Sequence, residues 1–130
     1  MSAERLEVSP GPRVVLVVKD ETTRFWAENS LLFAGSEVVL KAGTLGEVFD
    51  WARQNQERKA EVIVLGDCLP SWLKGRKGRK IDRQIRTELP GVKIVTLSFE
   101  KRPIGDKKVS LDSFYENKVN LGEVVNLIRV

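Results

Sequence analysis

V-I-V-L-G-D-C-L-P, residues 62–70, is the stretch of the sequence that decides the fold. Its first four residues are aliphatic, which is typical of a central parallel strand covered on both faces. Gly66 then ends this run, at the point where open α/β sheets place their ligands and reactive groups. Glycine has no side chain that could act as an acid, a base or a nucleophile. The sequence therefore predicts a strand end without its central chemical group.

Aliphatic runs alternate with helical spacing on both sides of this stretch. We expect strands at 13–19, 37–41, 60–65, 92–97 and 113–115, and helices at 21–34, 44–55, 79–89 and 120–129. Strands that alternate with helices predict one parallel sheet with right-handed crossovers. The fold class is therefore α/β: a flavodoxin-like, doubly wound, five-stranded sheet in three α/β/α layers.

Two segments lack the pattern of strands and helices, and one helix has a predicted inward face. Residues 1–12, which end in Pro-Gly-Pro, are expected to form a flexible arm before a single domain at 13–130. Residues 99–110 are weak in every signal and would hold at most a weak fourth helix. For the helix at 21–34, the large apolar residues are expected to form the inward face: Phe25, Trp26, Leu31, Leu32 and Phe33.

Composition excludes several classes of protein. The 130 residues are 42% hydrophobic and 31% charged, as in a globular domain, and no apolar run approaches the roughly 20 residues of a membrane helix. The N-terminus also lacks the apolar run of a signal peptide. Cys68 is the only cysteine, which fits a reducing cytoplasm, and the absence of histidine removes the usual proton shuttle and zinc ligand. We expect no metal or other cofactor.

The positive charge lies in the second half of the chain. The net charge is +4, made up of −2 for residues 1–65 and +6 for residues 66–130. A basic segment at 72–80 could contact an anion or the phosphate backbone of a nucleic acid. The alternative, which we favour because no further aromatic residues are interleaved, is a solvated loop whose charges only aid solubility. The candidate residues are Trp72, Lys74, Arg76, Lys77, Arg79 and Lys80.

The strand ends carry a second pattern. L-V-V-K-D-E at 16–21 ends the first strand, I-V-T-L-S at 94–98 ends the fourth, and F-Y-E-N-K-V at 114–119 lies near the fifth. Together with Gly66 and Pro70, this order resembles the receiver domain of bacterial response regulators over residues 13–130.

The resemblance implies a role for each of these positions. Lys19 and Asp20 stand where the family has an acidic pair that helps hold Mg²⁺, and Gly66 stands where it has the phospho-accepting aspartate. Ser98 matches the Ser or Thr that contacts the phosphoryl group. Lys118 matches the lysine after strand five, and Tyr115 matches the aromatic switch residue three positions before it.

The pocket of the family has three carboxylates: the acidic pair and the phospho-accepting aspartate. Here Lys19 and Gly66 replace two of them, and Asp20 keeps the third. Mg²⁺ needs several oxygen ligands, and a like-charge contact with Lys19 at ~4 Å costs about 4 kcal/mol per charge pair. We expect a pseudo-receiver of bacterial two-component-type signalling that is not an enzyme and acts by binding a protein partner. The resemblance implies that its interface is the face formed by residues 99–130, through which homodimerisation is an option.

Two alternatives stay open. Asp67 could be a shifted phosphoacceptor, which would make the chain a functional phosphorelay receiver. Strand alternation points this residue away from the pocket, so we interpret it as an aspartate that caps backbone amides. Lys19, Asp20 and Lys118 could form an ion-pair cluster in place of the metal, or only a surface salt bridge.

Overall fold

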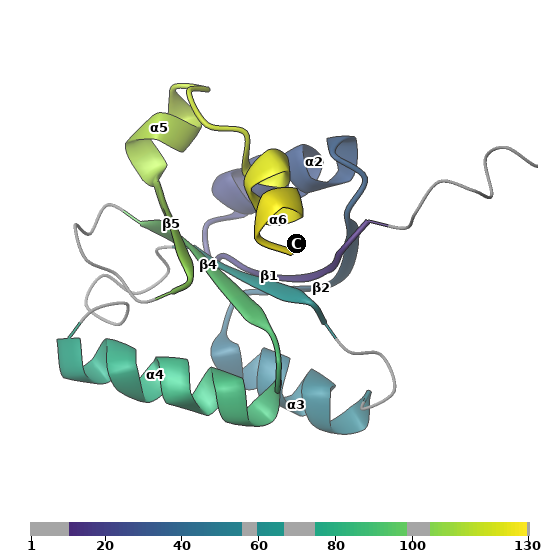
Figure 1. Cartoon of the computed structure of the whole chain (residues 1–130), viewed down its shortest axis with the longest axis vertical. Coiled ribbons are helices and arrows are strands. Elements are labelled where there is room, and N and C mark those ends of the chain that lie inside the picture. Colours follow the sequence, from purple (N-terminus) through teal and green to yellow (C-terminus); the bar gives the residue numbers. More distant parts are fainter. Residues whose placement is uncertain (1–10, 56–59, 67–74, 99–104, 130) are drawn as a thin grey trace, which may run out of the picture.

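The computed structural model describes residues 11–55, 60–66, 75–98 and 105–129. Within these residues the chain forms a five-stranded sheet in the order β2-β1-β3-β4-β5, with every neighbouring pair parallel (Figure 1). The strands are β1 (Arg13–Val17), β2 (Glu37–Ala42), β3 (Val62–Gly66), β4 (Lys93–Ser98) and β5 (Lys107–Ser110). This strand order is that of a flavodoxin-like doubly wound sheet, so the predicted fold class is confirmed.

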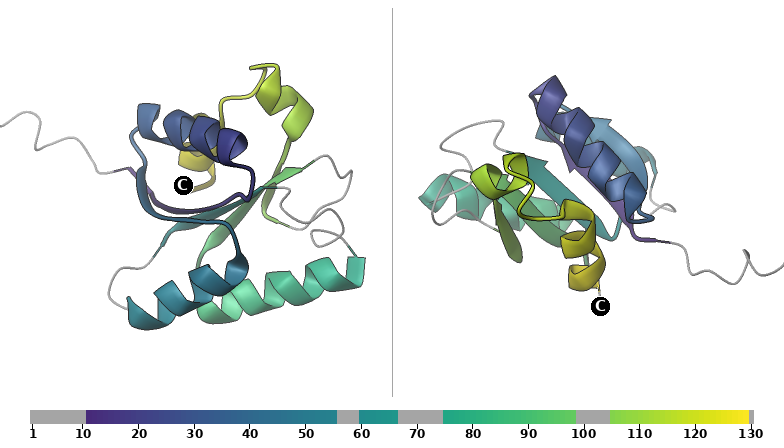
Figure 2. Two further views of the ribbon diagram at one scale, coloured as in Figure 1. Left: turned by 180° about the vertical axis from the view of Figure 1, so that it is seen from behind. Right: turned by 90° about the horizontal axis from the view of Figure 1, so that it is seen from above.

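Helices cover both faces of the sheet (Figures 1 and 2). On one face lie α3 (Leu45–Gln54) and α4 (Gly75–Glu88). On the other face lie α2 (Glu21–Phe33), α5 (Leu111–Tyr115) and α6 (Leu121–Arg129). Among the described helices, none combines the length and the apolar character needed to cross a bilayer.

Strand β3 is the central strand of the sheet. All five of its residues are buried, as the continuous aliphatic run predicts. Successive side chains of a strand point to opposite faces, so Val62 and Val64 pack beneath α2 and α6, whereas Ile63 and Leu65 pack against α3 and α4. Full burial of each such side chain contributes ~1.5–3 kcal/mol. The end of β3 therefore has a rigid support.

Polar caps set several of the helix ends. Asp20 is the N-cap of α2, and the Asn120 Oδ1 atom accepts a hydrogen bond of 3.1 Å from the backbone N of Glu123 at the start of α6. Gly35, just after the end of α2, has φ +89°, a left-handed conformation that glycine adopts with little strain. The helices expected at 21–34 and 120–129 thus begin and end within one residue of the predicted bounds.

The inward face of α2 differs from the predicted one. Its buried residues are Thr23, Ala27 and Leu31, which follow one another at four-residue spacing. Of the five large residues expected inside, only Leu31 is buried. The other four are exposed: Phe25 by 59%, Trp26 by 50%, Leu32 by 50% and Phe33 by 94%.

The close approach of α2 to α6 explains this difference. A Cβ atom at Gly122 of α6 would collide with the backbone oxygen of Ser30 and with the Ala34 Cβ atom at the end of α2. Only small side chains fit between two backbones that lie this close. The bulky residues of α2 are therefore turned outward, which a count of hydrophobic residues could not reveal.

The fifth strand was placed wrongly from the sequence. The structure has it at Lys107–Ser110, and residues 113–115, which we expected to form it, belong to α5. Strand β5 lies at the sheet edge and buries only Val109, and edge strands commonly carry lysines, so it has no run of apolar residues to mark it. Residues 107–110 are therefore a strand and not part of the weak helix expected over 99–110. Residues 99–104 of that segment lie outside the described part.

The start of α4 also differs from the predicted one. It begins at Gly75, four residues before the predicted start at residue 79. Two glycines, at 75 and 78, made this stretch resemble a loop in the sequence. Residues 75–80 of the basic segment 72–80 are therefore helical.

Candidate functional site

Several predicted site residues meet at the carboxyl edge of the sheet. Strands β1 and β4 are the two neighbours of β3, so the residues after β1 and the last residue of β4 lie on either side of Gly66. The structure thus brings Lys19, Asp20, Gly66 and Ser98 to one edge. Gly66 and Ser98 are buried, whereas Lys19 and Asp20 are exposed.

The space beside Gly66 is occupied by Val18. A Cβ atom added to Gly66 would lie 2.7 Å from Val18 Cγ2 and 3.0 Å from Val18 Cγ1. Val18 is itself 2% exposed, so it has little room to move away. The last residue of β3 therefore offers no nucleophile, and the apolar side chain of Val18 occupies the space that a side chain at position 66 would need.

Asp20 uses one carboxylate oxygen to begin α2. Its Oδ2 atom accepts hydrogen bonds from the backbone N of Thr23 at 2.8 Å and from Thr23 Oγ1 at 2.7 Å. These two bonds, with a smaller contribution from the charge of Arg24, lower the pKa of the Asp20 carboxyl from its ordinary value. Asp20 is thus a charged helix cap at the edge of the site.

Thr23 links this cap to α5. Its Oγ1 atom lies 2.7 Å from the hydroxyl oxygen of Tyr115. The Tyr115 ring also contacts Trp26 edge to face, with the ring centroids 6.5 Å apart. Sequence reasoning missed Thr23, although its place three residues after an N-cap aspartate is a signal that could have identified it.

Tyr115 and Lys118 both lie after β5, separated from it by the turns of α5. Tyr115 is the last residue of α5, and Lys118 lies eight residues beyond Ser110, the end of β5. The Nζ atom of Lys118 forms an ion pair with Glu116 Oε1 at 3.0 Å. The ion-pair cluster of Lys19, Asp20 and Lys118, one of the two alternatives for these residues, stays a prediction.

Lys118 also borders a groove on the α2 side of the molecule. The groove encloses about 780 Å³ and is lined from α2 by Trp26 and Ser30, and from the other side by Tyr115, Lys118 and Asn120. The side chains of its lining are mostly polar or aromatic. It holds no arrangement of acids that suggests catalysis.

No metal site is found in the described residues. They contain no group of three or more Asp, Glu, Cys or His side chains that could hold an ion. Asp67, the alternative phosphoacceptor, lies outside the described residues, as do Cys68 and Pro70. Of the three carboxylates that the resemblance implies for this pocket, Asp20 is the one present in the described residues.

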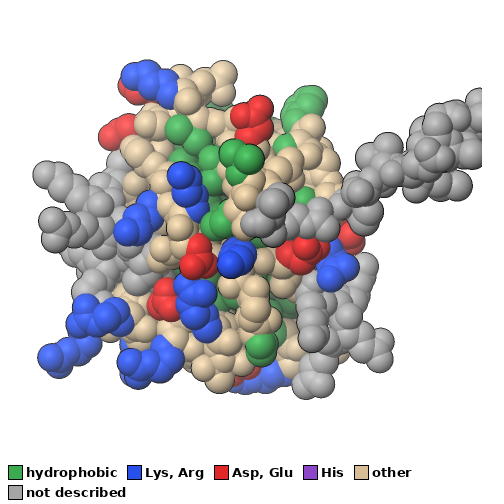
Figure 3. All heavy atoms as spheres, in the orientation of Figure 1, with side chains coloured by type: hydrophobic (Ala, Val, Ile, Leu, Met, Phe, Trp, Pro, Cys, Tyr) green, Lys and Arg blue, Asp and Glu red, His purple; other side chains and the backbone are tan. Residues whose placement is uncertain are grey.

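Helix α4 presents a basic surface, which we call the basic face: Arg76, Lys77, Arg79, Lys80 and Arg83, all exposed. Its side chains gather over the N-terminal end of α4, at the lower left of Figure 3. Within the described residues these five side chains form no ion pair, and the acid nearest to them in the sequence, Asp82, is bound to Arg86. Trp72 and Lys74, the other members of the predicted segment, lie outside the described residues.

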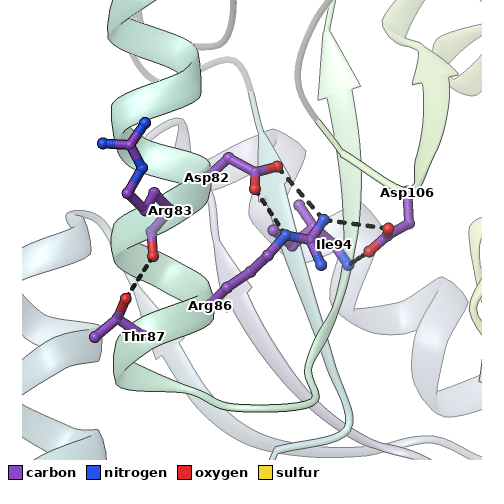
Figure 4. Close-up of polar contacts among 6 residues, drawn as sticks. All are labelled: Asp82, Arg83, Arg86, Thr87, Ile94 and Asp106. Atoms are coloured by element: carbon purple, nitrogen blue, oxygen red, sulfur yellow. Dashed lines mark hydrogen bonds and ion pairs between the residues drawn. The ribbon is translucent and has the colours of Figure 1, made fainter.

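Arg86 anchors α4 to the sheet (Figure 4). Its Nε atom donates to Asp82 Oδ1 at 2.7 Å, and its Nη2 atom donates to Asp106 Oδ1 at 3.1 Å. The other oxygen of Asp106 accepts from the backbone N of Ile94 in β4 at 2.8 Å. The contacts with both carboxylates raise the pKa of Arg86. The helix that carries the basic face is therefore tied to β4 and to the residue before β5.

Comparison with known proteins supports the fold. No family model matches the sequence, and no curated protein matches it. Among solved structures, a response regulator from Thermotoga maritima is similar, with a TM-score of 0.59 and 20% sequence identity. The match covers 87% of this chain and 98% of that protein's chain. At this identity the likeness establishes a shared fold and leaves the chemistry to be argued from the site.

Proposed function

We propose that this chain is a receiver-like signalling module of the cytoplasm that is not phosphorylated at the usual position and acts by binding a protein partner. The observation that carries the proposal is the contact of Gly66 with Val18. The position that the resemblance assigns to the phosphoacceptor has no side chain, and its space is filled by a buried valine.

The neighbouring charges support the same conclusion. Phosphoryl transfer to a carboxylate needs a nucleophile and a cation that neutralises the developing negative charge. Lys19 places an ammonium group two residues after the end of β1, and one oxygen of Asp20 is already bound by Thr23. Mg²⁺, which prefers several oxygen ligands, would find one carboxylate and one like charge here. A module of this kind would signal through its surface.

Incubation with acetyl phosphate and Mg²⁺, followed by intact-mass measurement, tests the proposal. We expect no phosphoryl group on the wild-type chain. The matched control is Asp67→Asn, which should behave identically. A phosphoryl group that appears on the wild type and disappears in Asp67→Asn would overturn the proposal and establish the alternative, a working phosphorelay receiver that uses Asp67.

The basic face of α4 favours a second candidate function, the binding of nucleic acid. Arg76, Arg79, Lys80 and Arg83 follow the spacing i, i+3, i+4, i+7, so they lie together on one side of the helix. Five exposed cations without acidic partners in the described residues form a surface suited to a phosphate backbone. The helical setting makes this candidate stronger than a loop with the same charges would.

Salt-dependent binding to a DNA duplex separates this candidate from a face that only aids solubility. If the basic face binds phosphates, affinity should fall as salt rises, with a slope of about −0.9 per contact. Replacing Arg76, Arg79 and Lys80 by glutamine should reduce that slope by roughly 3. The matched control is Lys41→Gln, which removes an exposed lysine on β2 that pairs with Glu28. Equal slopes for all three proteins would remove this candidate.

A further inference from the structure

Helix α2 exposes an apolar surface that the proposed site does not use. We call it the α2 patch: Phe25, Trp26, Asn29, Leu32 and Phe33. At 3.6 residues per turn, these five positions fall within about 120° of the helix circumference. They lie opposite the buried residues Thr23, Ala27 and Leu31, and Figure 2 shows α2 at the periphery of the molecule.

The α2 patch is large enough to form the apolar centre of an interface. With ~200 Å² for each aromatic side chain, the exposed fractions of Phe25, Trp26 and Phe33 leave on the order of 400 Å² of aromatic surface. Leu32 extends it. Monomeric proteins seldom expose a contiguous apolar patch larger than a few hundred Å², and one side of a standard interface buries about 800 Å². The patch can therefore form the apolar centre of one side.

The spacing of the patch is symmetric about Asn29. Phe25 and Phe33 lie four residues before and after it, and Trp26 and Leu32 lie three residues before and after it. In two antiparallel helices that cross at a twofold axis, residue 29−k of one helix faces residue 29+k of the other. The α2 patch is thus its own complement, which is the requirement for an isologous contact.

We propose that two copies of this chain associate through the α2 patch, with α2 antiparallel to its copy and Asn29 on the twofold axis. Phe25 of each copy then packs against Phe33 of the other, and Trp26 packs against Leu32. This proposal deepens the binding function proposed above by naming a second copy of the chain as a partner. The α2 patch adjoins the face formed by residues 99–130, because Trp26 contacts Tyr115 of α5.

The amide side chain at the centre of the patch agrees with a second copy of the chain as the occupant. A charged residue on the twofold axis would face its own copy and be repelled, and the residue on the axis is the uncharged Asn29. An amide carries both donors and an acceptor, so it can pair with itself. Asn29 is partly buried, and its side chain makes no hydrogen bond within the described residues.

Sedimentation equilibrium of the full chain tests the proposal. We expect a species of twice the chain mass of 14.7 kDa. Phe33→Glu should raise the dimer dissociation constant by more than about 30-fold, because it removes an aromatic residue at the interface and buries a charge. The matched control is Leu127→Glu, an equally drastic change in the last turn of α6, where Leu127 is 76% exposed. This control should leave the constant unchanged.

A cross-linking experiment keeps the test independent of how well Phe33→Glu folds. In a Cys68→Ser background, Asn29→Cys should form a disulfide-linked dimer on mild oxidation, because the two thiols meet at the axis. Glu47→Cys, on the exposed start of α3, should not. A monomeric wild type, a dimer that survives Phe33→Glu, or equal cross-linking at both positions would each overturn the proposal. None of these results depends on phosphorylation, so the two proposals can fail separately.

Discussion

Thr23 and Tyr115, 92 residues apart in the sequence, are joined by a hydrogen bond of 2.7 Å between their hydroxyl groups. A threonine hydroxyl has one proton, and Thr23 donates it to the Asp20 carboxylate at 2.7 Å. Tyr115 must therefore be the donor to Thr23. The three residues form a directed chain of hydrogen bonds from the edge of the candidate site to α5, and the Tyr115 ring continues it to Trp26 in the α2 patch.

Removing the phenol hydroxyl should weaken this connection. We expect Tyr115→Phe to lower the free energy of unfolding by about 1 kcal/mol, the usual net contribution of one hydrogen bond. The ring, and with it the contact with Trp26, is kept. Urea denaturation measures the change, and Thr23→Ser, which retains a hydroxyl group at position 23, is the control. A Tyr115→Phe protein as stable as the wild type would show that this bond does not hold α5 to α2.

The Asp20 cap should make stability depend on acid. Because the hydrogen bonds from Thr23 lower the folded-state pKa of Asp20, the cap stabilises the fold fully above the unfolded-state pKa of about 3.9. This stabilisation is lost as the pH falls through the lower folded-state pKa. Asp20→Asn keeps an N-cap that does not titrate.

We therefore expect the stability of Asp20→Asn to fall less steeply than that of the wild type below about pH 4. Denaturation curves recorded from neutral pH into this acid range measure the two slopes. Parallel slopes would mean that Asp20 titrates alike in the folded and unfolded chains. Asp112→Asn, a change at an exposed aspartate in the first turn of α5, provides the comparison.

The contact between Gly66 and Val18 predicts a non-additive pair of mutations. Gly66→Ala alone should cost about 1–3 kcal/mol, because the new Cβ atom meets Val18 Cγ2 at 2.7 Å in a packed interior. Val18→Ala removes that methyl group. The double variant should therefore lose less stability than the two single changes together, and a double-mutant cycle measures the difference. Additive effects would indicate that Val18 does not fill the space beside Gly66.

Restoring the carboxylates should create a magnesium site. Lys19→Asp and Gly66→Asp, combined with Val18→Ala to make room, would place two new carboxylates beside Asp20. We expect Mg²⁺ to raise the melting temperature of this variant, since a ligand that binds only the folded state stabilises it. Adding Asp20→Asn to the same variant should reduce the effect. Stabilisation of the wild-type chain by Mg²⁺ would contradict the function proposed above.

The sequence alone was enough for the central fold and for the gap in its site. Continuous aliphatic runs marked β1, β3 and β4, since strands covered on both faces must be apolar throughout. Helix starts depend on local caps such as Asp20 and Asn120, whose bonds reach only three residues along the chain, and the expected starts at residues 21 and 120 lie within one residue of the observed ones. The missing side chain at Gly66 was likewise visible in the sequence itself.

Contacts between distant segments were decided by the tertiary structure alone. Strand β5 is held by pairing with β4 rather than by its own hydrophobicity, and the close approach of α6 determines which side of α2 is buried. That Val18 fills the space at Gly66 and that Thr23 bonds Tyr115 could not be read from spacing, because each joins residues on different elements. Hydrophobic burial leaves a local pattern in a sequence, whereas the fit of one surface against another arises only when the chain is packed.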